Sequence, residues 1–166
     1  VNADVNATTD LGVTPLWLAS ENGNLSAVDM LLEAGADPRI QLLSGETAIM
    51  TAAQAGNGDV VRSLLKAGGD PDVSVTREQT ALMWAAARGN TDVVAALLEF
   101  GADVDALSLV REQYVKSEKE QDSHPNYKYW IEQGGNSALM FAARSGDLGS
   151  TQLLVEAGSD VNQVSA

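Results

Sequence analysis

The stretch Thr80-Ala-Leu-Met-Trp-Ala-Ala-Ala-Arg-Gly89 decides the fold, because the chain repeats its pattern. The copy Thr47-Ala-Ile-Met-Thr-Ala-Ala-Gln-Ala-Gly56 stands 33 residues earlier, and Ser137-Ala-Leu-Met-Phe-Ala-Ala-Arg-Ser-Gly146 stands 57 residues later. A further copy begins at Thr14. A fixed period of about 20 to 50 residues is typical of a solenoid, in which each unit packs on its neighbours. Since the last interval is 24 residues longer than the others, an insertion precedes the fourth unit.

Each unit carries signals for two short helices. A Thr or Ser before the apolar run suits an N-cap, and Pro15 suits the first helical position after Thr14. A glycine ends the first helix, and the next residue is expected to cap the second helix. These glycine and cap pairs are Gly23-Asn24, Gly56-Asn57, Gly89-Asn90 and Gly146-Asp147. The second helices carry apolar pairs one turn apart, such as Val60-Val61 and Leu64-Leu65, which predicts a core face.

An aspartate follows the end of each second helix and is expected to accept hydrogen bonds from the amides of the turn. These residues are Asp37, Asp70, Asp103 and Asp160. Since Asp4 precedes Asp37 by the same 33 residues and the chain lacks an initial Met, we expect it to begin in the tail of an earlier repeat, as a piece of a longer protein. The fourth unit has the poorest second helix, because Gly149 and polar residues replace its apolar pair.

The combination of Thr14-Pro-Leu-Trp-Leu-Ala19, Gly23-Asn24, Leu31-Leu32 and Gly35-Ala-Asp37 with a 33-residue period resembles the ankyrin repeat. The variant Ala-Leu-Met-x-Ala-Ala in place of Thr-Pro-Leu-His-x-Ala-Ala is similar to that of bacterial ankyrin arrays. The resemblance implies an all-α ankyrin-repeat solenoid of helix-turn-helix units, with hairpin-like loops along one edge. The expected division is a preceding repeat's tail at 1–7, repeats at 8–40, 41–73, 74–106 and 134–166, and an insertion loop at 107–133.

Two positions of the first helix are expected to pack between repeats. The usual histidine of the family is replaced by Trp17, Met50, Met83 and Met140, which predicts apolar packing there. The next position carries Leu18, Thr51, Trp84 and Phe141. Because equivalent positions of successive repeats stack on each other, we expect this second set to be core and not an aromatic binding stripe.

The insertion concentrates aromatic residues: all three tyrosines, one tryptophan and the single histidine. The alternation around Val110–Lys116 and the segment Tyr127–Ile131 predict a long β-hairpin with a polar tip; a helical turn at Ser117–Asp122 is the alternative for its middle. Aromatic residues supply much of the energy of protein interfaces. Two interpretations stay open: the rings cover the junction of the third and fourth repeats, or they contact a partner.

Composition restricts the function classes. Acidic residues outnumber basic ones 23 to 10, a net charge of -13, which argues against nucleic-acid binding; the excess acid maintains solubility or steers a basic partner. No apolar run approaches the roughly 18 residues of a membrane span. The absence of cysteine excludes disulfides and thiolate metal sites, but leaves open whether this soluble chain is cytoplasmic, secreted or periplasmic.

Catalytic motifs are missing from the sequence. With one histidine, no cysteine and no phosphate-binding loop, no enzyme and no cofactor are predicted. Gly56-Asn-Gly58 lacks the preceding strand of a dinucleotide site and is interpreted as a turn. His124 near Glu120 and Asp122 is a candidate metal ligand, but a lone histidine in a polar loop is more often solvated, so no metal site is predicted.

We therefore predict a protein-protein interaction scaffold that recognises another protein through its concave face, its loop tips and the insertion. By resemblance to the ankyrin pattern and from the aromatic content of the insertion, the contact residues are Asp10, Leu11, Val13, Glu21, Asn22, Leu43, Glu46, Gln54, Thr76, Arg77, Gln79, Arg88, Tyr114, Tyr127, Tyr129, Trp130, Arg144 and Ser145. The alternative is a structural spacer of a longer array, or a repeat module that associates end to end with itself.

Overall fold

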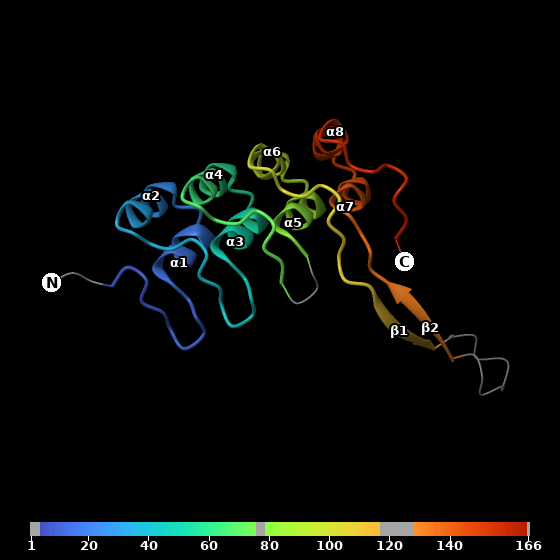
Figure 1. Ribbon diagram of the computed structural model, residues 1–166, viewed down its shortest axis with the longest axis horizontal. Coiled ribbons are helices and arrows are strands. Elements are labelled where there is room, and N and C mark those ends of the chain that lie inside the picture. Colours follow the sequence, from blue (N-terminus) through green and yellow to red (C-terminus); the bar gives the residue numbers. More distant parts are fainter. Residues whose placement is uncertain (1–3, 76–78, 117–127, 166) are drawn as a thin grey trace.

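The computed structural model describes residues 4–75, 79–116 and 128–165, with the backbone alone for strand residues 112–116 and 128–133. The helices form four helix-turn-helix pairs: α1 (Pro15–Glu21) and α2 (Leu25–Glu33), α3 (Ala48–Ala55) and α4 (Gly58–Lys66), α5 (Ala81–Arg88) and α6 (Thr91–Glu99), α7 (Ala138–Ser145) and α8 (Leu148–Glu156). In Figure 1, α1, α3, α5 and α7 form an inner row beside the loops, and α2, α4, α6 and α8 form an outer row. The predicted solenoid is confirmed.

The helix boundaries follow the capping residues. Thr14, Thr47 and Thr80 each accept a hydrogen bond from the amide three residues on, as predicted. Ser137 makes no side-chain cap bond, so that part of the prediction is wrong. Glycine ends α3 in a left-handed conformation, with φ of 80° at Gly56, where a side chain would add strain.

Caps of the outer helices divide into two kinds. The side chains of Asn24 and Asp147 each accept a hydrogen bond from the backbone amide three residues later, as predicted. Asn57 and Asn90 make no such bond. Instead, the Asn90 side chain donates to the Ala53 carbonyl of the preceding repeat at 2.9 Å. Asn90, which is expected to cap its own helix, thus links two repeats instead.

The core lies between the two helix rows. In α4, Val60, Val61 and Leu64 are at most 1% exposed, which confirms the predicted core face. The position that carries methionine is buried in the two middle repeats, at Met50 and Met83. The equivalent residues of the first and fourth repeats are half-buried.

The position after the methionine departs from the core prediction. Thr51 is buried, Trp84 and Phe141 are half-buried, and Leu18 is 46% exposed. The core prediction is therefore wrong for Leu18, because α1 packs against an inner-row helix, α3, on one side only within this chain.

Aspartates hold the turns after the outer helices. The carboxylates of Asp37, Asp70 and Asp103 each accept the amide two residues on, as predicted. A second set of side chains, two positions later in the repeat, forms hydrogen bonds with the next turn along the array. The amides of Asp37, Asp103 and Asp160 donate to Oδ1 of Asn6, Asp72 and Asp105 of the preceding turn, at 2.9, 2.8 and 2.9 Å. Arg39 stands at the equivalent place between the first two repeats, where its guanidinium binds Asp37.

Replacing Arg39 by asparagine is expected to add a hydrogen bond between the turns of the first two repeats, because Asn6 makes the equivalent bond at the preceding junction. The new Oδ1 accepts the Asp70 amide, and one net hydrogen bond raises the melting temperature of a chain of this size by roughly 2–4 °C. The exposed ion pair that is lost contributes little. Arg39→Ala is the control, and thermal unfolding followed by circular dichroism is the measurement. Equal melting temperatures for the two variants would contradict the assignment.

The insertion extends one inter-repeat loop. In the second repeat the loop closes with the Leu42 amide donating to the Glu46 carbonyl at 2.9 Å. The equivalent bond before the fourth repeat joins Ser108 and Asn136 at 3.0 Å. Beyond it, β1 (Arg111–Lys116) pairs antiparallel with β2 (Lys128–Gln133). The polar tip is predicted at Lys116 to Asn126; Lys116 is instead the last residue of β1, and the rest of the tip lies outside the described residues.

The third and fourth repeats contact each other directly despite the insertion. Thr91 Oγ1 donates to Asp147 Oδ2 at 2.9 Å, and Ser145 Oγ donates to the Ala86 carbonyl at 3.1 Å. Helices α5 and α7 are neighbours in the inner row (Figure 1). The junction therefore has its own interactions.

Deleting residues 110–133 restores the 33-residue period and joins Leu109 to Gly134, which leaves a loop as long as the one between Leu42 and Glu46. We expect the free energy of unfolding to stay the same or rise by up to about 1.5 kcal/mol, because a shorter loop loses less entropy on closure. Urea denaturation measures it. A decrease of more than about 1 kcal/mol would instead support the interpretation that the aromatic residues cover the junction.

Candidate partner-binding groove

A groove crosses the inner helices of the first three repeats. It has a volume of about 370 Å³. Glu21 on α1 and Gln54 on α3 occupy related positions of successive helices, and Arg88 closes the groove from α5. The full lining is Trp17, Glu21, Glu46, Thr51, Gln54, Ala55 and Arg88. Since inner helices stack at a fixed spacing, residues at their exposed ends form one continuous surface.

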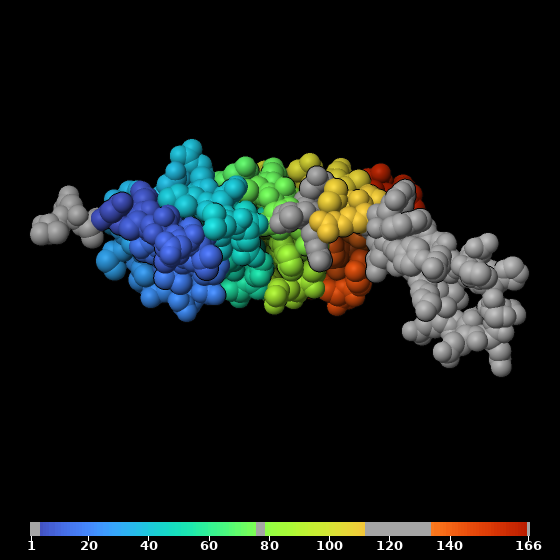
Figure 2. Space-filling model, turned by 90° about the horizontal axis from the view of Figure 1, so that it is seen from below, coloured from blue at the N-terminus to red at the C-terminus, as the bar shows by residue number. Residues whose placement is uncertain are grey.

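Loop tips extend this surface at the first two repeats. The Leu43 amide donates to the Leu11 carbonyl at 3.1 Å, so the two leucines lie side by side on adjacent loops. Leu11 is 66% exposed and Leu43 is 80% exposed. Figure 2, which views the molecule from below, shows the loops of successive repeats as neighbours. Adjacent exposed apolar side chains are typical of contact surfaces.

Arg144 is held in place on the fourth repeat. Its guanidinium carbon lies 5.3 Å from the centre of the Phe141 ring, and its Nη2 donates to Asn136 Oδ1 at 3.1 Å. A cation over an aromatic face is attracted to the ring. Because the side chain is both exposed and restrained, it would lose little conformational entropy on meeting an acidic group.

Charge changes sign along the inner side of the array. The acidic residues Asp10, Glu21 and Glu46 belong to the first two repeats, whereas Arg88 and Arg144 belong to the last two. Gln54 separates the two sets within the groove. The surface therefore has an acidic part followed by a basic part.

The structure gathers four of the predicted contact residues into the groove: Glu21, Glu46, Gln54 and Arg88. Asp10 and Leu11 are exposed, and Val13 and Gln79 are half-buried outside its lining. Two predicted contacts also serve the fold: Asn22 donates to the Leu18 carbonyl, and Ser145 to Ala86 and Ala142.

Other predicted contact residues have a limited description. Tyr114, Tyr129 and Trp130 belong to β1 and β2, of which the backbone is described. Thr76, Arg77 and Tyr127 lie outside the described residues, as does the candidate metal ligand His124.

Sequence reasoning missed three lining residues: Trp17, Thr51 and Ala55. The sequence predicts packing between repeats for Trp17, but the side chain is half-buried at the groove wall. The signal was present, since a bulky tryptophan stands where two middle repeats carry buried methionines.

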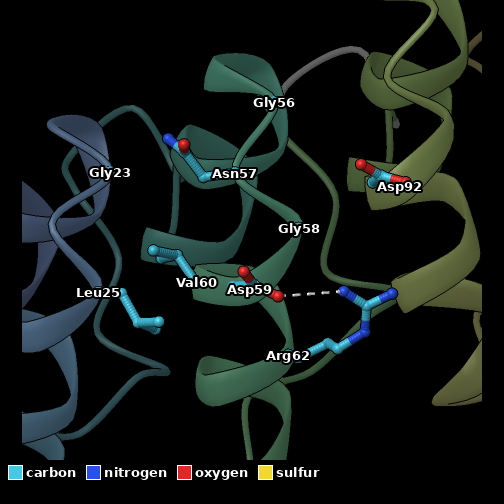
Figure 3. Close-up of a pocket in the computed structure, with 9 residues that line it drawn as sticks. All are labelled: Gly23, Leu25, Gly56, Asn57, Gly58, Asp59, Val60, Arg62 and Asp92. Carbon is cyan, nitrogen blue, oxygen red and sulfur yellow. Dashed lines mark hydrogen bonds and ion pairs between the residues drawn. The ribbon is translucent and has the colours of Figure 1, made fainter.

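A second depression, of about 260 Å³, lies by the turns between inner and outer helices (Figure 3). Gly56, Asn57 and Gly58 line it, which confirms that Gly56-Asn-Gly58 is a turn into α4. Arg62 lines it too, but its guanidinium is paired with Asp59 at 3.5 Å and with Glu99 at 3.4 Å. The depression therefore offers no unpaired cation to an anionic ligand.

Within residues 4–75, 79–116 and 128–165, no group of three or more His, Cys, Asp or Glu side chains is placed to hold a metal ion. Among the same residues, no helix is long and apolar enough to cross a membrane.

A solenoid of paired helices with a grooved inner side defines the chain as an α-helical repeat protein. A family model described as "Ankyrin repeats (3 copies)" matches residues 16–108 and 71–165, so the chain belongs to the ankyrin-repeat family. Such repeats are generally protein-protein interaction modules, and the family is typically non-catalytic. No curated protein matches the chain significantly.

Proposed function

We propose that the chain binds another protein along its inner side, in the groove between Trp17 and Arg88 and at the neighbouring loop tips. The observation that carries this is the groove itself, which brings Glu21, Glu46 and Arg88 from three repeats to one surface. Its wall combines an aromatic residue with charged groups, a composition common at the centre and rim of protein interfaces. The insertion extends the loop before the fourth repeat, beyond the hydrogen bond between Ser108 and Asn136.

The charge pattern indicates the chemistry of the partner. A matching surface has basic residues against Glu21 and Glu46 and acidic residues against Arg88 and Arg144, with an apolar group between Trp17 and the loop leucines. Complementary charges fix the orientation of a bound protein and raise its association rate. Since charges of both signs are involved, a uniformly basic partner would fit only half of the surface.

Charge reversal tests the proposal on a partner captured by the full chain. The double variant Glu21→Lys, Glu46→Lys is expected to weaken binding by about tenfold or more, because reversing two contact charges replaces attraction with repulsion. Isothermal titration calorimetry measures the affinity. The matched control Glu33→Lys, Glu156→Lys changes the net charge equally on exposed residues of α2 and α8 in the outer row.

The control variant is expected to bind within about twofold of the native chain, since rim and remote charges contribute little. If both double variants lose affinity equally, the acidic charge acts at long range and the groove is not the site. If neither does, the partner binds elsewhere on the array.

End-to-end self-association is the second candidate, and exposed apolar residues at both ends of the array favour it. Leu18 and Met30 in the first pair are 46% and 66% exposed, and Leu148 and Val155 in the last pair are 70% and 47% exposed. Contacts between unlike ends do not close, so this assembly would grow beyond two copies as concentration rises. Light scattering over a dilution series measures that growth.

A further inference from the structure

The register of the two strands places like charges opposite each other. Lys116 pairs with Lys128 at one end, and Glu112 pairs with Glu132 near the other. Like charges directly opposite on one face destabilise a ribbon. A two-stranded sheet is in any case marginal in water without further packing. This arrangement therefore works against the ribbon unless something else meets that face.

Three cross-strand pairs share one face, because alternate residues of a strand lie on the same side. In order from the array outward they are Glu112–Glu132, Tyr114–Trp130 and Lys116–Lys128. We call this the acid–aromatic–base face. The opposite face carries Arg111–Gln133, Gln113–Ile131 and Val115–Tyr129, with no like-charge pair. Only the acid–aromatic–base face has paired charges that indicate which charges a surface bound to it would carry.

We propose that the acid–aromatic–base face docks on the same face of a second copy of the chain. The two-fold axis lies between the ribbons, perpendicular to the strands, at the Tyr114–Trp130 pair. Rotation about it reverses the order of the three pairs, so Lys116 comes opposite Glu112 of the second copy and Lys128 comes opposite its Glu132. The like-charge pairs of each ribbon then face opposite charges.

The spacing of the pairs supports this symmetry. Successive pairs on one face are about 6.7 Å apart along the strands, so the acidic and basic pairs are equally distant from the aromatic pair between them. A two-fold axis parallel to the strands would instead set acid against acid and base against base. The charge order therefore selects one of the two face-to-face arrangements and places the aromatic pair at its centre, where interface energy is usually concentrated.

The position of the ribbon permits the approach of a second copy. In Figure 1, β1 and β2 extend away from both rows of helices, on the side of the loops. Two six-residue strands offer less than the ~800 Å² per partner of a standard stable interface. We therefore expect a weak dimer. Its formation has to be followed at protein concentrations up to about 1 mM.

Charge variants of the full chain provide the first test. Glu112→Lys with Glu132→Lys makes both charged pairs basic, and Lys116→Glu with Lys128→Glu makes both acidic. Each variant alone is expected to dimerise at least tenfold more weakly in sedimentation equilibrium, whereas an equimolar mixture recovers the dimer mass. Exchanging all four charges at once is expected to retain the native dimer. Unchanged circular dichroism shows that the repeats stay folded.

Three results would overturn the proposal: a native chain that is monomeric at 1 mM, a mixture that stays monomeric, or a mass that grows beyond two copies. The last result would indicate end-to-end assembly. The proposed binding groove is unaffected by any of them, since none of the four exchanged residues lines it.

Cross-linking gives a second and independent test, because the chain has no cysteine of its own. Tyr114→Cys places one thiol beside the proposed axis, and a short bismaleimide is expected to link two copies there. Val115→Cys is the matched control, since its position belongs to the opposite face. Equal yields of linked dimer from the two variants would show random collision and would contradict the docked arrangement.

Discussion

Replacing Leu64 by alanine lowers the free energy of unfolding by about 2–5 kcal/mol, the largest effect that we expect from a single substitution. Leu64 is fully buried in α4, between the outer helices of the first and third repeats. The change removes apolar contacts and leaves a cavity that the neighbouring repeats fill only in part. Because a domain is stable by only about 5–15 kcal/mol, urea denaturation would show a much lower midpoint.

The matched control is Leu31→Ala, which changes the equivalent residue of the first repeat. Leu31 is half-buried, so the same truncation removes fewer contacts and leaves less of a cavity. We expect its effect to be less than half of that at Leu64. Equal losses at the two positions would contradict the packing described here.

Asp147→Ala has the second-largest expected effect, a loss of about 1–2 kcal/mol at neutral pH. The carboxylate accepts the Ser150 amide at the start of α8 and the Thr91 hydroxyl of the preceding repeat. Its removal therefore weakens a helix cap and the junction between the third and fourth repeats together. Asn57→Ala is the control, because Asn57 holds the equivalent place in α4 and makes no side-chain cap bond.

The effect of Asp147 depends on pH in a direction that its hydrogen bonds determine. Interactions with Ser150, followed by the hydroxyl of Thr91 and nearby amides, hold the pKa of Asp147 below its ordinary value of 3.8, although burial opposes this. Hydrogen bonds to the ionised carboxylate thus contribute stability above pH 3.8, which is lost as pH falls through the lowered pKa. The difference between the native chain and Asp147→Ala is expected to shrink below about pH 4. A difference that stays constant down to pH 2 would show that the carboxylate's charge is irrelevant.

Local signals predicted much of the fold correctly. Caps at Thr14, Thr47 and Thr80 and the left-handed Gly56 depend on backbone conformation within about one helical turn. The core face of α4 follows from the spacing of its valines and leucines. These features lie within a few residues along the chain, and the 33-residue period repeats them.

Predictions that depended on the fit between repeats were less successful. Leu18 was expected to be buried and is exposed, while Trp17 was expected to pack between repeats and lines the groove. Asn90 was expected to cap its own helix and instead bonds to the preceding repeat. Leu18 is exposed because α1 has an inner-row neighbour on one side only, whereas the contacts of Trp17 and Asn90 depend on how far one helix pair is displaced and turned relative to the next, which periodicity does not specify.

The sequence by itself determined the period of the repeat, most of the helix boundaries and the position of the insertion. These features follow from backbone preferences and burial patterns, which act over short spans of chain. Only the tertiary structure decided which side chains share the groove, which aspartates cross between turns, and that Glu112 and Lys116 pair with like charges. Those relations join residues of different repeats, as between Asp105 and Asp160 or Trp17 and Arg88, and residues of the two paired strands. They are set by the stacking geometry of the helices and by strand register, which are properties of the folded array.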